Sequence, residues 1–152
     1  MSAAITNTIA SAAVVVRRTI AASAEDLFDA WLDPEAMVQW MRPNKVRRTE
    51  VRVEPRVGGS YEILMLIDSG NVLHTGVYRV IDRPRRLVFT WMSGPTENKE
   101  TLVTVDFVPA GKRTEVIVTH ELLPESAMAS HNNGWTASLG LLEELFERGV
   151  VK

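Results

Sequence analysis

The sequence predicts an α+β fold, in which a curved antiparallel sheet of about seven strands wraps around a long C-terminal helix. Three observations lead to this prediction. Six consecutive β-rich runs, separated by short turn-forming segments, fill residues 45–122. The segment 128–146 repeats apolar side chains at helical spacing. Two short helix-forming segments follow a first strand near the N-terminus, which gives the element order β-α-α-β-β-β-β-β-β-α.

The first elements are predicted from their composition and from helix-start signals. Residues 13–21 are rich in β-branched side chains and read as a strand. Ser23 is placed to cap a helix, with Asp26 three residues later in a capping-box pattern. Asp33 is placed to cap a second short helix, with Pro34 in its first turn, where the missing N–H costs nothing.

The six runs that follow have the length and composition of strands. Glycine, proline and asparagine occur in the gaps between them, as expected for turns. Gaps this short favour antiparallel hairpins, because a parallel return needs a dozen or more residues. The expected strands span residues 45–55, 60–68, 72–81, 86–92, 101–108 and 113–122.

Periodicity predicts which side chains face the interior. On the last helix the expected apolar stripe contains Met128, His131, Trp135, Leu139, Leu142 and Phe146. On the strands the concave face is expected to carry Tyr61, Ile63, Met65, Ile67, His74, Gly76, Tyr78, Val80, Leu87, Phe89, Trp91, Val103, Val105 and Phe107. The stripe needs a large partner, and the sheet is the only one available.

Composition limits the class of protein. Of the 152 residues, 45% are hydrophobic and 24% are charged, which is typical of a globular chain. We expect residues 1–12 to form a flexible tail and residues 13–152 a single domain. A net charge of −2 provides no overall attraction to nucleic acid or to anionic membranes.

The sequence contains no cysteine, which excludes disulfides, thiolate nucleophiles and cysteine zinc sites. The N-terminus has neither the basic start nor the apolar core of a signal peptide. No segment approaches the ~20 apolar residues of a membrane span. We therefore expect a cytoplasmic protein.

An internal pocket between the sheet and the last helix is the predicted site. Trp135 is expected to form its wall, with Gly134 allowing a close approach of backbone or ligand. Trp40 ends a short helix before a proline and is expected at the cavity mouth. The residues predicted to contact a ligand are Trp31, Trp40, Tyr61, Met65, His74, Tyr78, Trp91, His131, Trp135 and Leu139. Ordinary core packing is the alternative for each of them.

No catalytic or metal-binding signature is present. His74, His120 and His131 come from different predicted elements and lack the HExxH spacing of a metal site. No GxSxG elbow, phosphate-binding glycine motif or close carboxylate pair occurs. We therefore assign no catalytic residue, no metal and no cofactor, and expect His131, His74 or Tyr78 to orient a polar group of the ligand.

The basic segment near residues 42–56 does not predict nucleic-acid binding. Arginines and glutamates alternate along one face of the expected strand, as in a solvated ladder of ion pairs. A surface that follows phosphates would carry one sign of charge.

Five stretches, in this order, resemble the activator of heat-shock-protein-90 ATPase homologue family of the START-like, or SRPBCC, superfamily. They are SAEDLFDAWLDPEAMVQW, EPRVGGSYEILM, HTGVYRVIDRPRRLVFTW, TLVTVDFVPAGKRTEVIVTHE and HNNGWTASLGLLEEL. The resemblance implies a helix-grip fold with a hydrophobic cavity between the sheet and the C-terminal helix. It also implies small-molecule ligands, since many members of the superfamily bind lipids, sterols or aromatic metabolites there.

The expected function is the binding of a small hydrophobic or amphipathic molecule in this cavity. The alternative is an enzyme of cyclase, dehydratase or hydrolase type that acts on an aromatic or polyketide-like substrate. Chaperone ATPase activation is expected less, because the eukaryotic co-chaperones of the family carry a separate N-terminal domain and this sequence has only a short tail before its first strand. An edge strand offers a surface for a homodimer.

Overall fold

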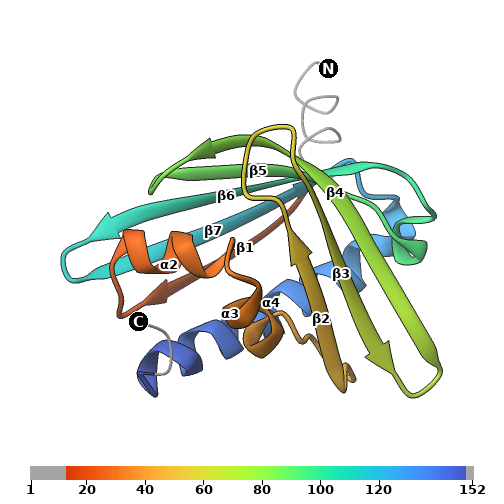
Figure 1. Ribbon diagram of the computed structural model, residues 1–152, viewed down its shortest axis with the longest axis horizontal. Coiled ribbons are helices and arrows are strands. Elements are labelled where there is room, and N and C mark those ends of the chain that lie inside the picture. The colour runs from red at the N-terminus through yellow and green to blue at the C-terminus, as the bar shows by residue number, and fades with distance from the viewer. Residues whose placement is uncertain (1–12, 150–152) are drawn as a thin grey trace, which may run out of the picture.

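A computed structural model describes residues 13–149 and contains one seven-stranded antiparallel sheet (Figure 1). The strand order is β1-β7-β6-β5-β4-β3-β2, so that β1 and β2 form the two edges. The strands are β1 Val14–Ile20, β2 Arg48–Val53, β3 Ser60–Ile67, β4 Gly70–Asp82, β5 Arg86–Trp91, β6 Thr101–Ala110 and β7 Arg113–Glu121. The predicted fold class and element order are confirmed, whereas the tail expected over residues 1–12 lies outside the described residues.

Among residues 13–149, three α-helices accompany the sheet: α2 Ala24–Ala30, α3 Pro34–Trp40 and α4 Met128–Glu147. Both predicted caps form. The Ser23 hydroxyl accepts from the backbone N–H of Asp26 at 3.1 Å, and the Asp33 carboxylate accepts from that of Glu35 at 3.0 Å. Short 3-10 turns, η1 Gly94–Thr96 and η2 Glu125–Ala127, occur after β5 and before α4. None of the helices in the described residues combines the length and the hydropathy that a membrane span requires.

Helix α4 runs along the concave side of the sheet, as the helix-grip prediction requires (Figure 1). Most side chains predicted to face it are buried, but Val80 is 39% exposed. The prediction for Val80 is wrong because the β4–β5 register shifts between Tyr78 and Val80. This irregularity reverses the alternation of faces, so that Ile81 packs against the core in place of Val80.

The buried stripe of α4 differs from the prediction at its C-terminal end. Leu145 is fully buried, whereas Phe146 is only partly buried. Steps of three and four residues after Leu142 both match a helical period of 3.6, so spacing alone does not decide between them. Away from the stripe, Glu143 accepts from Arg18 of β1 at 2.7 Å, which attaches α4 to the edge of the sheet.

The outer face of β2 carries ion pairs, one within the predicted ladder of arginines and glutamates and one to the neighbouring strand. Arg48 contacts Glu50 at 2.8 Å, and Arg52 contacts Glu62 of β3 at 3.4 Å. These side chains are about half exposed or more, so each pair contributes little to stability.

Strand β4 is shared between two parts of the sheet. Its first half, Gly70 to Val77, pairs with β3, and its second half, from Tyr78, pairs with β5. Where the two halves meet, the ring of Tyr61 lies over its cross-strand partner Gly76, and its hydroxyl donates to the Thr90 carbonyl of β5. A Cβ at position 76 would lie 2.5 Å from a ring carbon of Tyr61 and closer still to that carbonyl oxygen. Only glycine fits at this position.

We therefore expect Gly76→Ala to lower the free energy of unfolding by about 2–3 kcal/mol, because the methyl group displaces Tyr61 or separates the strands. Gly134→Ala is the matched control: its Cβ would meet only Pro43, at 3.6 Å, and alanine favours a helix interior by up to ~1 kcal/mol. Urea denaturation of the two variants measures both effects. A Gly76→Ala protein as stable as the wild type would contradict this packing.

Candidate functional site

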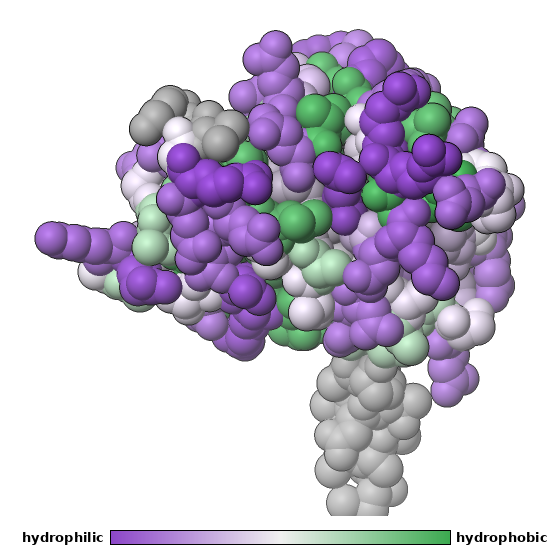
Figure 2. Space-filling model, turned by 90° about the horizontal axis from the view of Figure 1, so that it is seen from below, coloured by the Kyte–Doolittle hydropathy of each residue, from purple (hydrophilic) through white to green (hydrophobic). Residues whose placement is uncertain are grey.

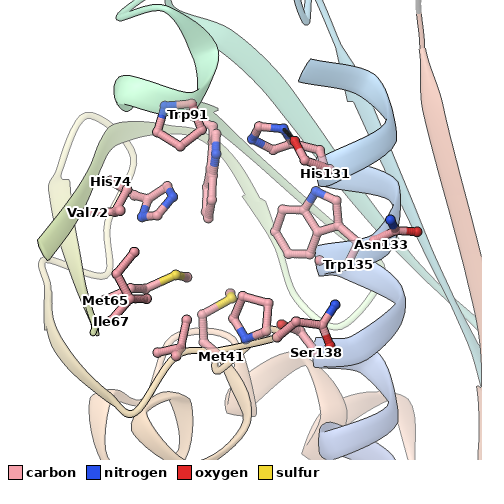
Figure 3. Close-up of a pocket in the computed structure, with 16 residues that line it drawn as sticks. Met41, Met65, Ile67, Val72, His74, Trp91, His131, Asn133, Trp135 and Ser138 are labelled. Atoms are coloured by element: carbon pink, nitrogen blue, oxygen red, sulfur yellow. Dashed lines mark hydrogen bonds between the residues drawn. The ribbon is translucent and has the colours of Figure 1, made fainter. Parts of the chain in front are cut away.

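A cavity of about 350 Å³ lies between α4, the distal part of the β3–β4 hairpin and the segment that follows α3 (Figure 3). Its α4 wall contains Ser130, His131, Asn133, Gly134, Trp135 and Ser138. The sheet wall contains Met65, Ile67, Val72, His74 and Trp91. The rim contains Met41, Pro43, Asn44, Val46 and Pro95. None of these sixteen lining residues of the described chain is an aspartate, glutamate, lysine or arginine.

The structure brings five of the ten predicted ligand-contact residues to this cavity and places five elsewhere. Those at the cavity are Met65, His74, Trp91, His131 and Trp135. Trp31, Tyr61 and Tyr78 border a separate void of about 10 Å³, which has room for about one water molecule. Leu139 is fully buried and lines neither space.

Trp40 does not lie at the cavity mouth, contrary to the prediction. It is fully buried, packs against Trp31 with ring centroids 4.6 Å apart, and donates its indole N–H to the Ala30 carbonyl at 3.1 Å. The rim begins one residue later, at Met41, and continues through Pro43 and Asn44. Proline and asparagine are typical turn residues, so Pro43 and Asn44 could have indicated from the sequence that the chain leaves the core at this point.

Trp135 is fixed by a buried chain of hydrogen bonds that starts at its indole nitrogen. Nε1 donates to Nδ1 of His120 at 3.0 Å, and Nε2 of His120 lies 2.7 Å from the hydroxyl of Thr101. That hydroxyl donates to the carbonyl of Trp91. Because an indole N–H can only donate, Nδ1 of His120 is unprotonated and its proton resides on Nε2.

This chain of hydrogen bonds connects α4 to β7, β6 and β5. Burial lowers the pKa of His120 to about 3, so its ring is neutral near pH 7, as the chain requires. Trp135 also contacts Trp91 and Trp31, with ring centroids 5.2 and 5.9 Å away. Trp135 is therefore both a core residue and a wall of the cavity.

His131 and His74 each use one ring nitrogen within the protein. Nδ1 of His131 lies 2.8 Å from the Ala127 carbonyl, one turn back on α4. Nδ1 of His74 lies 3.4 Å from the Ile63 carbonyl on the neighbouring strand β3. Within the described chain, Nε2 of neither ring has a hydrogen-bond partner. Burial lowers the pKa of His74 to about 4 and lowers that of His131, so both rings are neutral near pH 7.

The cavity combines an apolar wall with a few polar atoms. Its body is formed by methionine, aliphatic and indole side chains, and its polar end by the two imidazoles on either side of Trp91 (Figure 3). Among the described residues, no group of three His, Cys, Asp or Glu side chains is placed to hold a metal ion. Such a cavity can hold an uncharged molecule and orient it by hydrogen bonds.

The lowered pKa values predict that acid weakens the fold. Below pH 6.5 the unfolded chain binds protons on His74 and His120, whereas the folded chain does not until about pH 4 and 3. Since the unfolded state then binds more protons, the free energy of unfolding falls with falling pH, by up to ~1.4 kcal/mol per pH unit per histidine.

Urea denaturation at pH 7, 6 and 5 measures this dependence, and His74→Phe should show a shallower slope because one titrating ring is removed. A stability that stays constant from pH 7 to 5 would contradict the buried neutral state of these rings.

The family model described as "Activator of Hsp90 ATPase homolog 1-like protein" matches residues 21–147. Among solved structures, CV1439 from Chromobacterium violaceum is 22% identical, with a TM-score of 0.80 over 89% of this chain and 96% of that one. A protein from Rhodobacter sphaeroides is 22% identical, with a TM-score of 0.79 over 91% of this chain and 94% of its own.

DynU16, a protein of the dynemicin biosynthetic locus, is 20% identical, with a TM-score of 0.73 over 91% of this chain and 48% of DynU16. At these identities the structural likeness shows a shared fold. Comparison with curated proteins finds no matching sequence. The family model covers most of the chain, and the sheet grips a C-terminal helix as the sequence resemblance implied: this protein belongs to the Activator of Hsp90 ATPase homolog 1-like family, with the START-like helix-grip fold.

Proposed function

We propose that the protein binds a small, uncharged and mostly apolar molecule in the cavity between α4 and the β3–β4 hairpin. The observation that carries this proposal is the lining: sixteen residues without a charged side chain line a cavity of about 350 Å³ and include two imidazole nitrogens without a protein partner among the described residues. The volume lies at the lower end of the range for small-molecule sites. Affinity would come from burial of apolar ligand surface, at about 25 cal/mol per Å².

The family supports this proposal at a general level, because the helix-grip fold commonly holds hydrophobic ligands between sheet and helix. DynU16, which shares the fold, comes from a biosynthetic locus for a natural product.

An enzyme of cyclase, dehydratase or hydrolase type is a second candidate, favoured by one observation. Nε2 of His131 is unprotonated and lies at the cavity, as a general base requires. The ring is oriented by the Ala127 carbonyl, however, and no carboxylate of residues 13–149 lines the cavity to stabilise an imidazolium. Turnover that is lost in His131→Ala while ligand affinity is kept would identify an enzyme.

Chaperone ATPase activation remains the least expected role. A partner-binding module would expose a contiguous apolar patch. On the face drawn in Figure 2, hydrophilic side chains predominate and hydrophobic residues show only in small separate areas. We keep a homodimer through edge strand β1 or β2, and a cytoplasmic location based on the absence of cysteine, as further parts of the proposal.

Obstruction of the cavity tests the proposal. Position 134 lies on the α4 wall, and a Cβ there would meet only Pro43 of the rim, at an ordinary contact distance of 3.6 Å. We expect Gly134→Leu to fill part of the cavity and to weaken binding of N-phenyl-1-naphthylamine, an uncharged fluorophore, at least tenfold. Gly134→Ala, which adds a single methyl group, should bind it within about threefold of the wild type, a difference below ~1 kcal/mol.

Fluorescence titration measures these affinities, and native mass spectrometry of freshly purified protein detects a copurified ligand in the same three proteins. Equal binding of the fluorophore by wild type and Gly134→Leu would show that the cavity is not the binding site.

A further inference from the structure

We infer that the cavity selects uncharged ligands that donate a hydrogen bond, through a hydroxyl or N–H group, to Nε2 of His131 and His74. This inference rests on the proposed function and names the chemical class of its ligand. It follows from the protonation pattern of the two imidazoles and from the absence of charge around them.

The backbone fixes the tautomer of His131. A carbonyl oxygen only accepts, so the ring nitrogen 2.8 Å from the Ala127 oxygen, Nδ1, must carry the proton. In a neutral imidazole the other nitrogen, Nε2, then presents a lone pair. Because His131 is buried and lines the cavity, this lone pair is an acceptor that a ligand can satisfy.

His74 provides the same arrangement from the opposite wall. Its Nδ1 faces the Ile63 carbonyl, which leaves Nε2 as a second acceptor. His74 projects from β4 and His131 from α4, with Trp91 between them (Figure 3). The rings of His74 and Trp91 lie 4.6 Å apart. One end of the cavity, here called the histidine end (His74, Trp91 and His131), therefore offers two acceptors from facing walls.

None of the three residues that form the histidine end offers a ligand an accessible hydrogen-bond donor, because each imidazole N–H already faces a backbone carbonyl. The indole N–H of Trp91 has no partner in the described chain, but protein atoms enclose it. A ligand that only accepts hydrogen bonds, such as an ether, would leave both imidazole acceptors unsatisfied. A hydroxyl or N–H group satisfies at least one of them.

A carboxylate or phosphate is disfavoured at the histidine end for two reasons. No lysine or arginine of the described chain lines the cavity, so a buried anion would have no counter-ion. Protonation of the imidazoles would supply a counter-ion, but burial lowers the pKa of both rings, and the neighbouring His131 lowers the pKa of His74 further. The nearest basic residues in the sequence, Arg42 and Lys45, are exposed beside the rim.

Three probes with the same bicyclic body test the inference: 2-naphthol, which is neutral and donates, 2-methoxynaphthalene, which only accepts, and 2-naphthoate, which is an anion. By isothermal titration calorimetry at neutral pH, we expect 2-naphthol to bind about tenfold tighter than either of the others. A tenfold ratio corresponds to 1.4 kcal/mol.

His131→Phe keeps an aromatic ring and removes the acceptor, so the preference for 2-naphthol over 2-methoxynaphthalene should fall to about threefold or less. Asn132→Ala is the control, since Asn132 is on the same helix, is exposed and does not line the cavity. It should leave all three affinities unchanged.

The outcomes separate this inference from the proposed function. Equal or tighter binding of 2-methoxynaphthalene or 2-naphthoate, or a preference that His131→Phe leaves intact, overturns the inference while ligand binding stands. If the three probes do not bind but N-phenyl-1-naphthylamine does, its own N–H group is the candidate donor, and binding that His131→Phe leaves unchanged overturns the inference. If none of the four binds, the proposed function fails as well.

Discussion

The packing of α4 against the concave face of the sheet is the interaction on which both the fold and the cavity depend. Leu139, Leu142 and Leu145 are fully buried in this interface. Nearer the N-terminal end of the helix, the stripe continues with Trp135 and His131, which line the cavity. The same stripe therefore forms the core at one end and a binding cavity at the other.

Two buried hydrogen-bond arrangements shape that open end. The chain from Trp135 through His120 and Thr101 fixes the indole against the sheet. The Tyr61 hydroxyl, which crosses Gly76 to reach β5, connects the two halves of the sheet where β4 passes from one to the other. Beyond that point the β3–β4 hairpin carries Met65 and His74 to the cavity wall. The tyrosine and glycine thus support the site without lining its main cavity.

Sequence patterns predicted the architecture because each strand and helix carries its own periodicity and turn signals. They failed where structure departs from a regular period. The irregularity after Tyr78 reversed the exposure of Val80, and α4 buried Leu145 in preference to Phe146, a choice that spacing leaves open.

For the site, strand alternation correctly predicted that Met65, His74 and Trp91 face inward. An inward-facing side chain, however, can contact either the packed core or the cavity. Trp31, Tyr61 and Tyr78 face inward where α2 and α3 fill the space. Only the tertiary arrangement separates the two cases.

Long-range ¹H–¹⁵N correlation NMR of the histidine side chains tests the central claim most directly, because it reports the protonation state of each ring nitrogen. The account predicts three neutral rings at pH 7, with the proton on Nδ1 in His74 and His131 and on Nε2 in His120. Addition of 2-naphthol should shift Nε2 of His131 and His74 and leave His120 nearly unchanged. Charged rings, the opposite tautomer in His131, or shifts confined to His120 would contradict an uncharged cavity that presents two acceptors to its ligand.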